Sequence, residues 1–127
     1  MIFARRTFPI AGVFDLMALV PMYLLEGRIG RDIPPPITHP EYFHGFVGVA
    51  VAWQVAFVVI ARDPVRSRPL MIPAVLEKAA FGLAVVAFWL GGRLPAPVLA
   101  FGLIDLALGV LFVVAYLGTP TSPGRRP

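Results

Sequence analysis

Four long apolar stretches, separated by shorter polar segments, occupy residues 8–25, 43–61, 71–90 and 97–117 of the chain. A helix rises about 1.5 Å per residue, so about 20 apolar residues cross roughly 30 Å of hydrocarbon. Each stretch has about this length. The pattern therefore predicts an all-α fold, an integral membrane up-down-up-down four-helix bundle that forms a single membrane domain over residues 1–127.

Prolines mark the first two boundaries in this pattern. Pro21 lies near the end of the first stretch and predicts a kink there, because proline lacks an amide hydrogen and its ring clashes with the preceding turn. Residues 26–42 form the longest polar segment and contain three consecutive prolines at 34–36. We therefore expect a stiff, non-helical external loop that covers the outer end of the bundle.

The remaining connections are short. Residues 62–69 and residues 91–95 each allow only a tight turn, so we expect the helices on either side to be antiparallel neighbours. Residues 118–127 carry several prolines and little apolar surface, and we expect this tail to be disordered.

Composition and charge agree with a membrane protein. The chain is 58% hydrophobic and 14% charged, which leaves few polar side chains to cover a soluble surface. The net charge of +4 would suggest nucleic acid for a soluble protein, but the arginines here lie between and beyond the apolar stretches, so we expect no nucleic-acid partner. One side of the membrane has the arginines at positions 5, 6, 62, 66, 68, 125 and 126, and the other side has those at 28, 31 and 93. The positive-inside rule therefore places both termini in the cytoplasm.

Every apolar stretch contains at least one ionisable or strongly polar side chain, and such groups are energetically costly at membrane depth. They are Asp15, Gln54, Glu77 with Lys78, and Asp105. Counted from the cytoplasmic ends, all lie roughly 10 Å deep except Asp105, at roughly 18 Å. We predict a buried polar cluster built on an Asp15–Lys78 ion pair, with Gln54 or Glu77 completing its hydrogen bonds. Asp105 should be deeper and less well matched, and could carry a proton.

Small residues share helix faces with these polar groups. Gly102 and Gly109 flank Asp105 at helical spacing, and Gly82 follows Lys78 by one turn. Small residues let membrane helices approach closely, so we expect these faces to meet other helices rather than lipid. Lys78 could alternatively extend its side chain to the cytoplasmic headgroups.

The polar cluster permits two interpretations. It could join the helices, each interhelical hydrogen bond contributing about 0.6 to 2 kcal/mol. It could instead form a ligand or proton site, with Asp105 and Glu77 as the titrating acids and Lys78 as their counter-ion. Trp53 would then form an apolar wall, although a packed core tryptophan is the alternative. This second interpretation requires an elongated apolar cavity that reaches Asp105.

A second group of polar residues lies at the predicted outer rim, and its members are His39, Glu41, Tyr42 and His44. Two imidazoles and a carboxylate could bind Zn²⁺ or Cu²⁺, but their spacing matches no metal motif, and we predict no metal site. His44 and Glu41 could act as acid and base on a lipidic substrate if His44 faces a cavity. The chain has no cysteine, which excludes disulfides and thiolate ligands.

The four stretches, the arginine-bearing cytoplasmic turn and the sparse buried acids together resemble the DoxX-like small bacterial membrane proteins. The resemblance covers the four stretches and rests on architecture and residue class. It implies a location in the bacterial inner (plasma) membrane, and some DoxX-like proteins are associated with quinone-linked redox complexes. Glu77 and Asp105 also resemble the ligand-cavity acids of four-helix sterol-isomerase-like and sigma-2-like membrane proteins.

Three functions are therefore open. The first, which the small size and the absence of a soluble domain favour, is a non-catalytic subunit or assembly partner that contacts another membrane protein or a second copy of itself. The second is binding of a lipid, a quinone-like molecule or a proton within the bundle. The third is an enzyme that acts on a lipidic substrate at the outer rim. The residues identify no cofactor.

Overall fold

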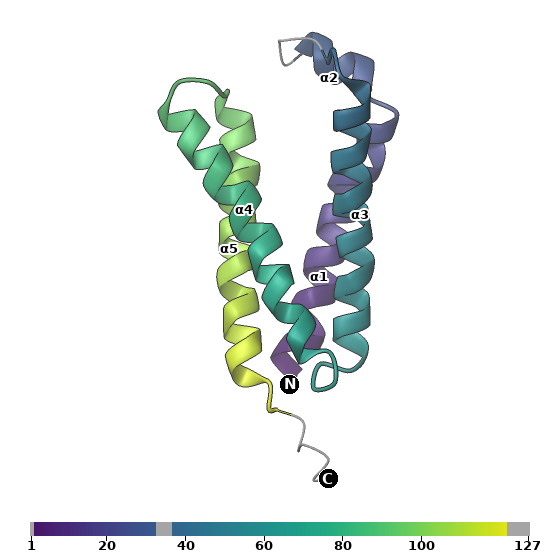
Figure 1. Ribbon diagram of the computed structural model, residues 1–127, viewed down its shortest axis with the longest axis vertical. Coiled ribbons are helices and arrows are strands. Elements are labelled where there is room, and N and C mark those ends of the chain that lie inside the picture. Colours follow the sequence, from purple (N-terminus) through teal and green to yellow (C-terminus); the bar gives the residue numbers. More distant parts are fainter. Residues whose placement is uncertain (1, 33–36, 122–127) are drawn as a thin grey trace.

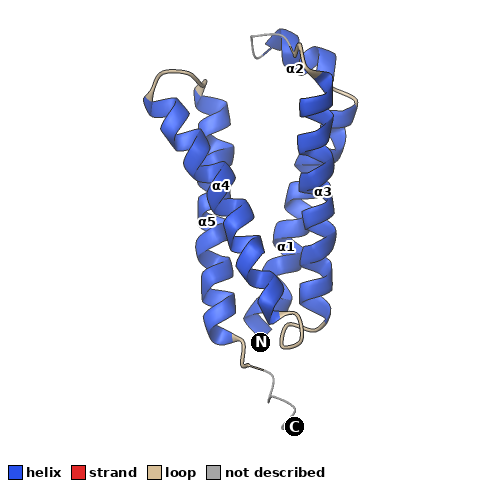
Figure 2. Cartoon of the chain, in the orientation of Figure 1, coloured by secondary structure: helices blue, strands red, loops and turns tan. Residues whose placement is uncertain are grey.

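The computed structural model describes residues 2–32 and 37–121, and in these residues all regular structure is helical (Figures 1 and 2). The α-helices are α1 (Ile2–Leu19), α2 (Glu26–Asp32), α3 (Pro40–Arg62), α4 (Met71–Leu90) and α5 (Ala96–Gly118). Two 3₁₀ segments, η1 (Val20–Tyr23) and η2 (Arg68–Leu70), continue α1 and precede α4. The all-α prediction is confirmed for the described part of the chain.

Three segments are long and apolar enough to cross a membrane, and they are Pro40–Arg62, Arg68–Leu90 and Ala96–Gly118. A fourth span exists if α1, η1 and α2 are counted together, but the chain bends by 91° between Ile2–Tyr23 and Glu26–Asp32. Pro21 lies in η1, immediately before this bend. The predicted kink near Pro21 is therefore confirmed, and its cause is the loss of regular helical hydrogen bonding at the proline.

The first helix and the external loop differ from the sequence expectation. α1 begins at Ile2 and ends at Leu19, several residues before the predicted stretch 8–25. Within the predicted loop 26–42, the first part is the helix α2, so the expectation of a wholly non-helical loop is wrong. Glu26 in its first turn and Arg31 in its last turn complement the helix dipole. The three prolines fall at 34–36, outside the described residues.

The helices form two pairs. α1 packs along α3, and α4 packs along α5 (Figure 1). The pairs meet at the end that carries the start of α1 and the turn 63–67, here called the closed end. They diverge toward the end that carries α2 and the turn 91–95, here called the open end. α3 and α4 therefore contact each other little, although they follow one another in the chain.

The hydrophobic core lies between the closed end and the middle of the molecule. Its residues come from all four long helices and are Ala4, Phe8, Ala11, Phe57, Ile60, Met71, Ala74, Phe112 and Ala115. The ring of Phe8 stacks on Phe112 with centroids 4.2 Å apart, and Phe57 meets Phe112 edge-on at 4.9 Å. These aromatic contacts join α1, α3 and α5, and so hold the two pairs together at this end.

α4 and α5 approach each other most closely at two glycines. A Cβ atom on Gly102 would lie 2.5 Å from Cγ1 of Val85, and one on Gly82 would lie 2.9 Å from the carbonyl oxygen of Gly102. Both distances are too short for a side chain. The small-residue face predicted around Asp105 does meet another helix here, because only glycine permits this separation.

The end of α5 is held against the turn that precedes α4. Nε of Arg68 donates hydrogen bonds to the carbonyl oxygens of Tyr116 (3.3 Å) and Thr119 (2.8 Å). The guanidinium also lies 3.8 Å from the centroid of the Tyr116 ring. Thr119 is buried, so the predicted disorder of 118–127 does not extend to its first residues. Residues 122–127 lie outside the described part of the chain.

Candidate functional site

A cluster of charged side chains joins the two helix pairs at mid-length. Lys78 of α4 donates hydrogen bonds to Oδ2 of Asp15 on α1 and to Oδ1 of Asp105 on α5, the latter at 3.2 Å. The predicted Asp15–Lys78 ion pair is thus present. Asp105 is the less closely held of the two aspartates, but it is paired, because the ammonium group lies between α1 and α5 and its several N–H groups serve both aspartates.

Glu77 completes the cluster without a hydrogen bond. Its Oε2 atom lies 3.6 Å from Nζ of Lys78, within ion-pair distance, and is buried without a hydrogen-bond partner among residues 2–32 and 37–121. The side chain of Lys78 is only 2% exposed, so it does not extend to the headgroups. The Phe57 ring of α3 faces Nζ with its centroid 5.5 Å away. All four long helices therefore contribute a side chain around Lys78.

The cluster contains more acid than base. One ammonium group faces the carboxyl groups of Asp15, Glu77 and Asp105, whose side chains are 10%, 19% and 13% exposed. If every group were ionised, the cluster would carry a formal charge of −2 in a poorly solvated interior, which is energetically costly. Among the described residues, no group of three His, Cys, Asp or Glu is placed to hold a metal ion. Protons, or a cationic group of a bound molecule, are the remaining ways to balance this charge.

The expectation that Gln54 or Glu77 completes the hydrogen bonds of the cluster is not met among the described residues, because Glu77 makes none there and neither does Gln54. Its side chain is fully buried, and Nε2 donates to the carbonyl oxygen of Ala50 one turn earlier in α3, at 2.9 Å. Its Oε1 atom is buried and has no hydrogen-bond partner among the described residues. The amide is therefore tied to its own helix, which depth alone could not predict.

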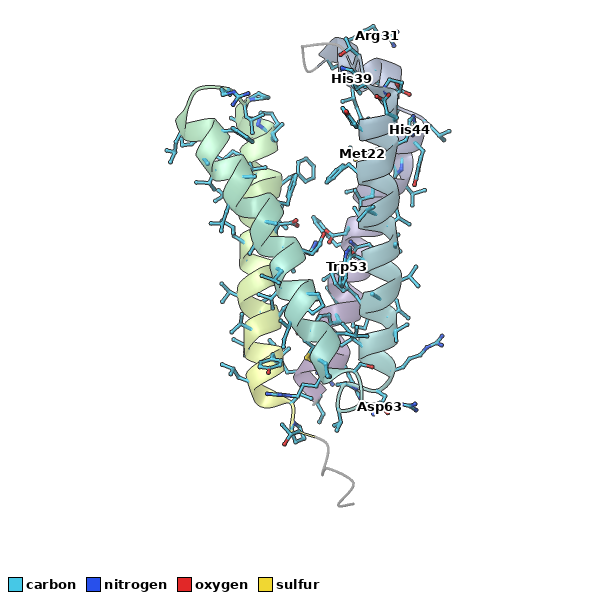
Figure 3. The ribbon with its side chains drawn as sticks, viewed as in Figure 1. Met22, Arg31, His39, His44, Trp53 and Asp63 are labelled. Carbon is cyan, nitrogen blue, oxygen red and sulfur yellow. The ribbon has the colours of Figure 1, made fainter. Side chains whose placement is uncertain are left out.

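A groove of about 490 Å³ lies between α3 and α4, beside the cluster. Its walls are apolar except at Glu77, and the lining residues are Phe46, Val49, Ala50, Trp53, Pro73, Leu76, Glu77, Ala80 and Phe81. Figure 3 shows Trp53 on the side of α3 that faces α4. Trp53 also packs against the core cluster, so it is both core and groove wall.

The groove reaches Glu77, and Asp105 is not among the residues that line it. Consecutive residues of a helix point about 100° apart. Lys78 consequently faces α1 and α5, while Glu77 faces the groove. Glu77 therefore lines the groove and Asp105 does not, although both carboxyl groups lie within ion-pair distance of Nζ of Lys78.

The rim residues form two separate pairs. Nδ1 of His39 lies 3.2 Å from Oε1 of Glu41, and both side chains are exposed. Nε2 of His44 instead lies 2.8 Å from Oε2 of Glu26 on α2. The ring of His44 also stacks on Tyr23 of η1, with centroids 5.7 Å apart. Glu26 and Tyr23 were missed by the sequence reasoning because the packing of η1 along α3, and the direction of the bend that follows it, depend on the tertiary structure.

His44 and Trp53 lie on opposite faces of α3. They are separated by nine residues, or about two and a half helical turns, and Figure 3 shows them on opposite sides of the helix. His44 is not among the residues that line the groove. The rim enzyme required His44 to face a cavity with an acid within hydrogen-bond reach. An acid is within reach, but it is Glu26 and not Glu41, and His44 does not line the groove. Tyr42, the fourth rim residue, is exposed and lies beside the His39 ring, at 5.2 Å between centroids.

A scan against protein-family models and searches of curated proteins and of solved structures found no match for this chain. The resemblance to DoxX-like membrane proteins stays a prediction. The function of the site rests on its own geometry.

Proposed function

We propose that this chain is an integral protein of the bacterial inner membrane that binds a lipidic or quinone-like small molecule in the groove between α3 and α4. In this proposal α1, α3, α4 and α5 form an up-down-up-down four-helix bundle with both termini in the cytoplasm. The length and apolar composition of the helices support membrane insertion. The arginines at positions 5, 6, 62, 66 and 68 support a cytoplasmic location for the closed end.

One observation carries the proposal: among the residues that line the apolar groove, Glu77 alone is ionisable, and one of its carboxyl oxygens is buried with no hydrogen-bond partner in the described part of the chain. Small-molecule sites are typically concave and apolar, with few polar groups that orient the ligand. An apolar body would lie against Trp53 and Leu76. A polar head group at Glu77 would donate a hydrogen bond to the carboxyl group, whose Oε2 atom has, within the described ranges, only the ion-pair contact with Lys78. If the charged cluster only joined the helices, an open apolar groove with an acid in its wall would have no explanation.

The test is purification of the protein in mild detergent, followed by mass spectrometry of the small molecules that co-purify. Ala80→Phe places a ring in the groove, and Ala107→Phe makes the same change at an exposed position of α5 outside it. We expect Ala80→Phe to reduce the retained ligand at least about tenfold, a change of about 1.4 kcal/mol, and Ala107→Phe to retain it. Equal retention in both variants, or no bound small molecule in the native protein, would contradict the proposal.

A second candidate function is the non-catalytic subunit or assembly partner. The groove is open along one side, and Phe46 and Phe81 stand on its two walls with ring centroids 5.8 Å apart. A helix of another membrane protein, or of a second copy, could fill this surface by packing against those walls. The same purification separates the two functions: a stoichiometric protein that Ala80→Phe displaces would support an assembly role, and a small molecule would support ligand binding.

A further inference from the structure

The two helix pairs are held together by a shared core on the closed side of the charged cluster, whereas on the open side the stacked rings of Phe46 and Phe81, 5.8 Å apart, connect them. Every residue of the hydrophobic core lies on the closed side of Asp15 and Lys78. On the open side, α1 and η1 contribute no buried residue after Asp15. The buried residues of α4 beyond Lys78 are Gly82 and Val85, which face α5 in their own pair. The cluster therefore lies at the fork where the pairs begin to diverge (Figure 1).

The hydrogen bonds of Lys78 differ in which helices they join. The bond to Asp15 links α4 to α1 and so crosses between the pairs. The bond to Asp105 links α4 to α5 and stays within one pair. Glu77 is on α4 itself. The only ion pair between the two helix pairs, among the described residues, is therefore Asp15–Lys78.

We propose that the Asp15–Lys78 ion pair is a latch that sets the separation of the two helix pairs on the open side, and thereby the width of the groove. When the attraction between these two groups is lost, the pairs separate further at the open end. The closed end stays together because its aromatic core does not depend on the latch. This inference goes beyond the proposed function, since it concerns the arrangement of the helices with or without a ligand.

The remaining partners of Lys78 make the latch reversible. A buried ammonium group without a partner is strongly destabilising. Here, however, release of Asp15 leaves Lys78 beside Asp105 and Glu77, both on its own helix pair. The second pair can therefore move away as a unit without leaving Lys78 unpaired, although Asp15 gives up its counter-ion. Lys78 thus has a carboxylate partner both when Asp15 is bound and when it is released, and a two-state element requires two such arrangements.

The absence of cysteine allows the separation to be measured with spin labels on introduced cysteines. Gly45 on α3 and Ala87 on α4 report on the open side, and Val59 on α3 and Ile72 on α4 report on the closed side. All four positions are exposed. Pulsed electron–electron distances are measured for the full chain in lipid nanodiscs. The variants are Asp15→Asn and Asp105→Asn, each of which removes one carboxylate from Lys78.

We expect Asp15→Asn to lengthen the Gly45–Ala87 distance by on the order of 2 Å, the scale of helix shifts at packed interfaces, and Asp105→Asn to leave it unchanged. The Val59–Ile72 distance should not change in either variant. Asp15→Glu keeps the charge and should retain the native open-side distance.

Three results would overturn the latch. An unchanged open-side distance in Asp15→Asn shows that the ion pair does not set it. Equal shifts in Asp15→Asn and Asp105→Asn show that net charge, not the link between pairs, is responsible. A closed-side shift in Asp15→Asn shows that the ion pair holds the whole fold. No ligand is needed for this measurement, so its failure would leave the proposed function untouched.

Discussion

Lys78 and Asp15 are 63 positions apart in the chain, yet their side chains form the ion pair that joins α4 to α1. The pair lies where the shared core ends and the open groove begins. This ion pair can therefore affect both the stability of the packed helices and the shape of the candidate binding groove. The predictions below separate these contributions.

Replacement of Lys78 by methionine should destabilise the fold. The variant keeps the volume of the side chain but leaves three buried carboxyl groups without a counter-ion. We expect the free energy of unfolding to fall by about 3–5 kcal/mol, the usual result of removing one partner from a buried ion pair. Thermal unfolding in detergent, followed by circular dichroism, measures it. The double variant Asp15→Asn with Lys78→Met should lose less than the sum of the single variants, and strict additivity would show that the groups do not interact.

The close approach of α4 and α5 predicts unequal effects for two glycines on the same helix. Gly102→Ala places a methyl group 2.5 Å from Cγ1 of Val85, whereas the same change at Gly109 places one 3.4 Å from Cβ of Lys78. We expect Gly102→Ala to cost about 1–3 kcal/mol of unfolding free energy by overpacking, and Gly109→Ala to cost much less. Equal melting temperatures for these variants would mean that α4 and α5 are not so close.

Arg68 should protect the backbone amides at the end of α5 from hydrogen exchange. Its guanidinium both stacks on Tyr116 and donates to backbone oxygens, and the ammonium of lysine cannot reproduce this planar geometry. We expect Arg68→Lys to speed amide hydrogen exchange at residues 115–119 roughly fivefold, corresponding to about 1 kcal/mol of lost local stability. Arg66→Lys, an exposed change in the same turn, is the control. Unchanged exchange in Arg68→Lys would rule out this role.

His44 should fix α2 against α3. His44→Leu removes the hydrogen bond to Glu26, whereas the acid partner of His39 among the described residues is Glu41, two positions away in the chain, so His39→Leu breaks no contact with α2. The net contribution of such a bond is about 1 kcal/mol. Amides of α2 should therefore exchange several times faster in His44→Leu and at the native rate in His39→Leu. The prediction fails if both variants exchange alike.

Several features of this protein could be predicted from the sequence because they depend on local constraints. The length of an apolar run determines whether a helix crosses a bilayer, so three long helices agree with the predicted stretches within a few residues. Pro21 acts on its own backbone, so its bend was also predictable. The Asp15–Lys78 pairing followed from depth, because opposite charges at one level of a bundle neutralise each other.

Other features required the tertiary structure, because depth along a helix does not give the rotation of one helix against its neighbours. That rotation pairs Asp105 with Lys78, ties Gln54 to its own backbone and directs Glu77 into the groove. The partner of His44 depended on a chain bend of 91°, whose direction no local pattern specifies. The amino-acid order by itself thus determined which residues lie inside the helices and how deep. Only the packing of the two pairs decided which of them meet, since contacts between helices depend on shapes that are distant in the chain.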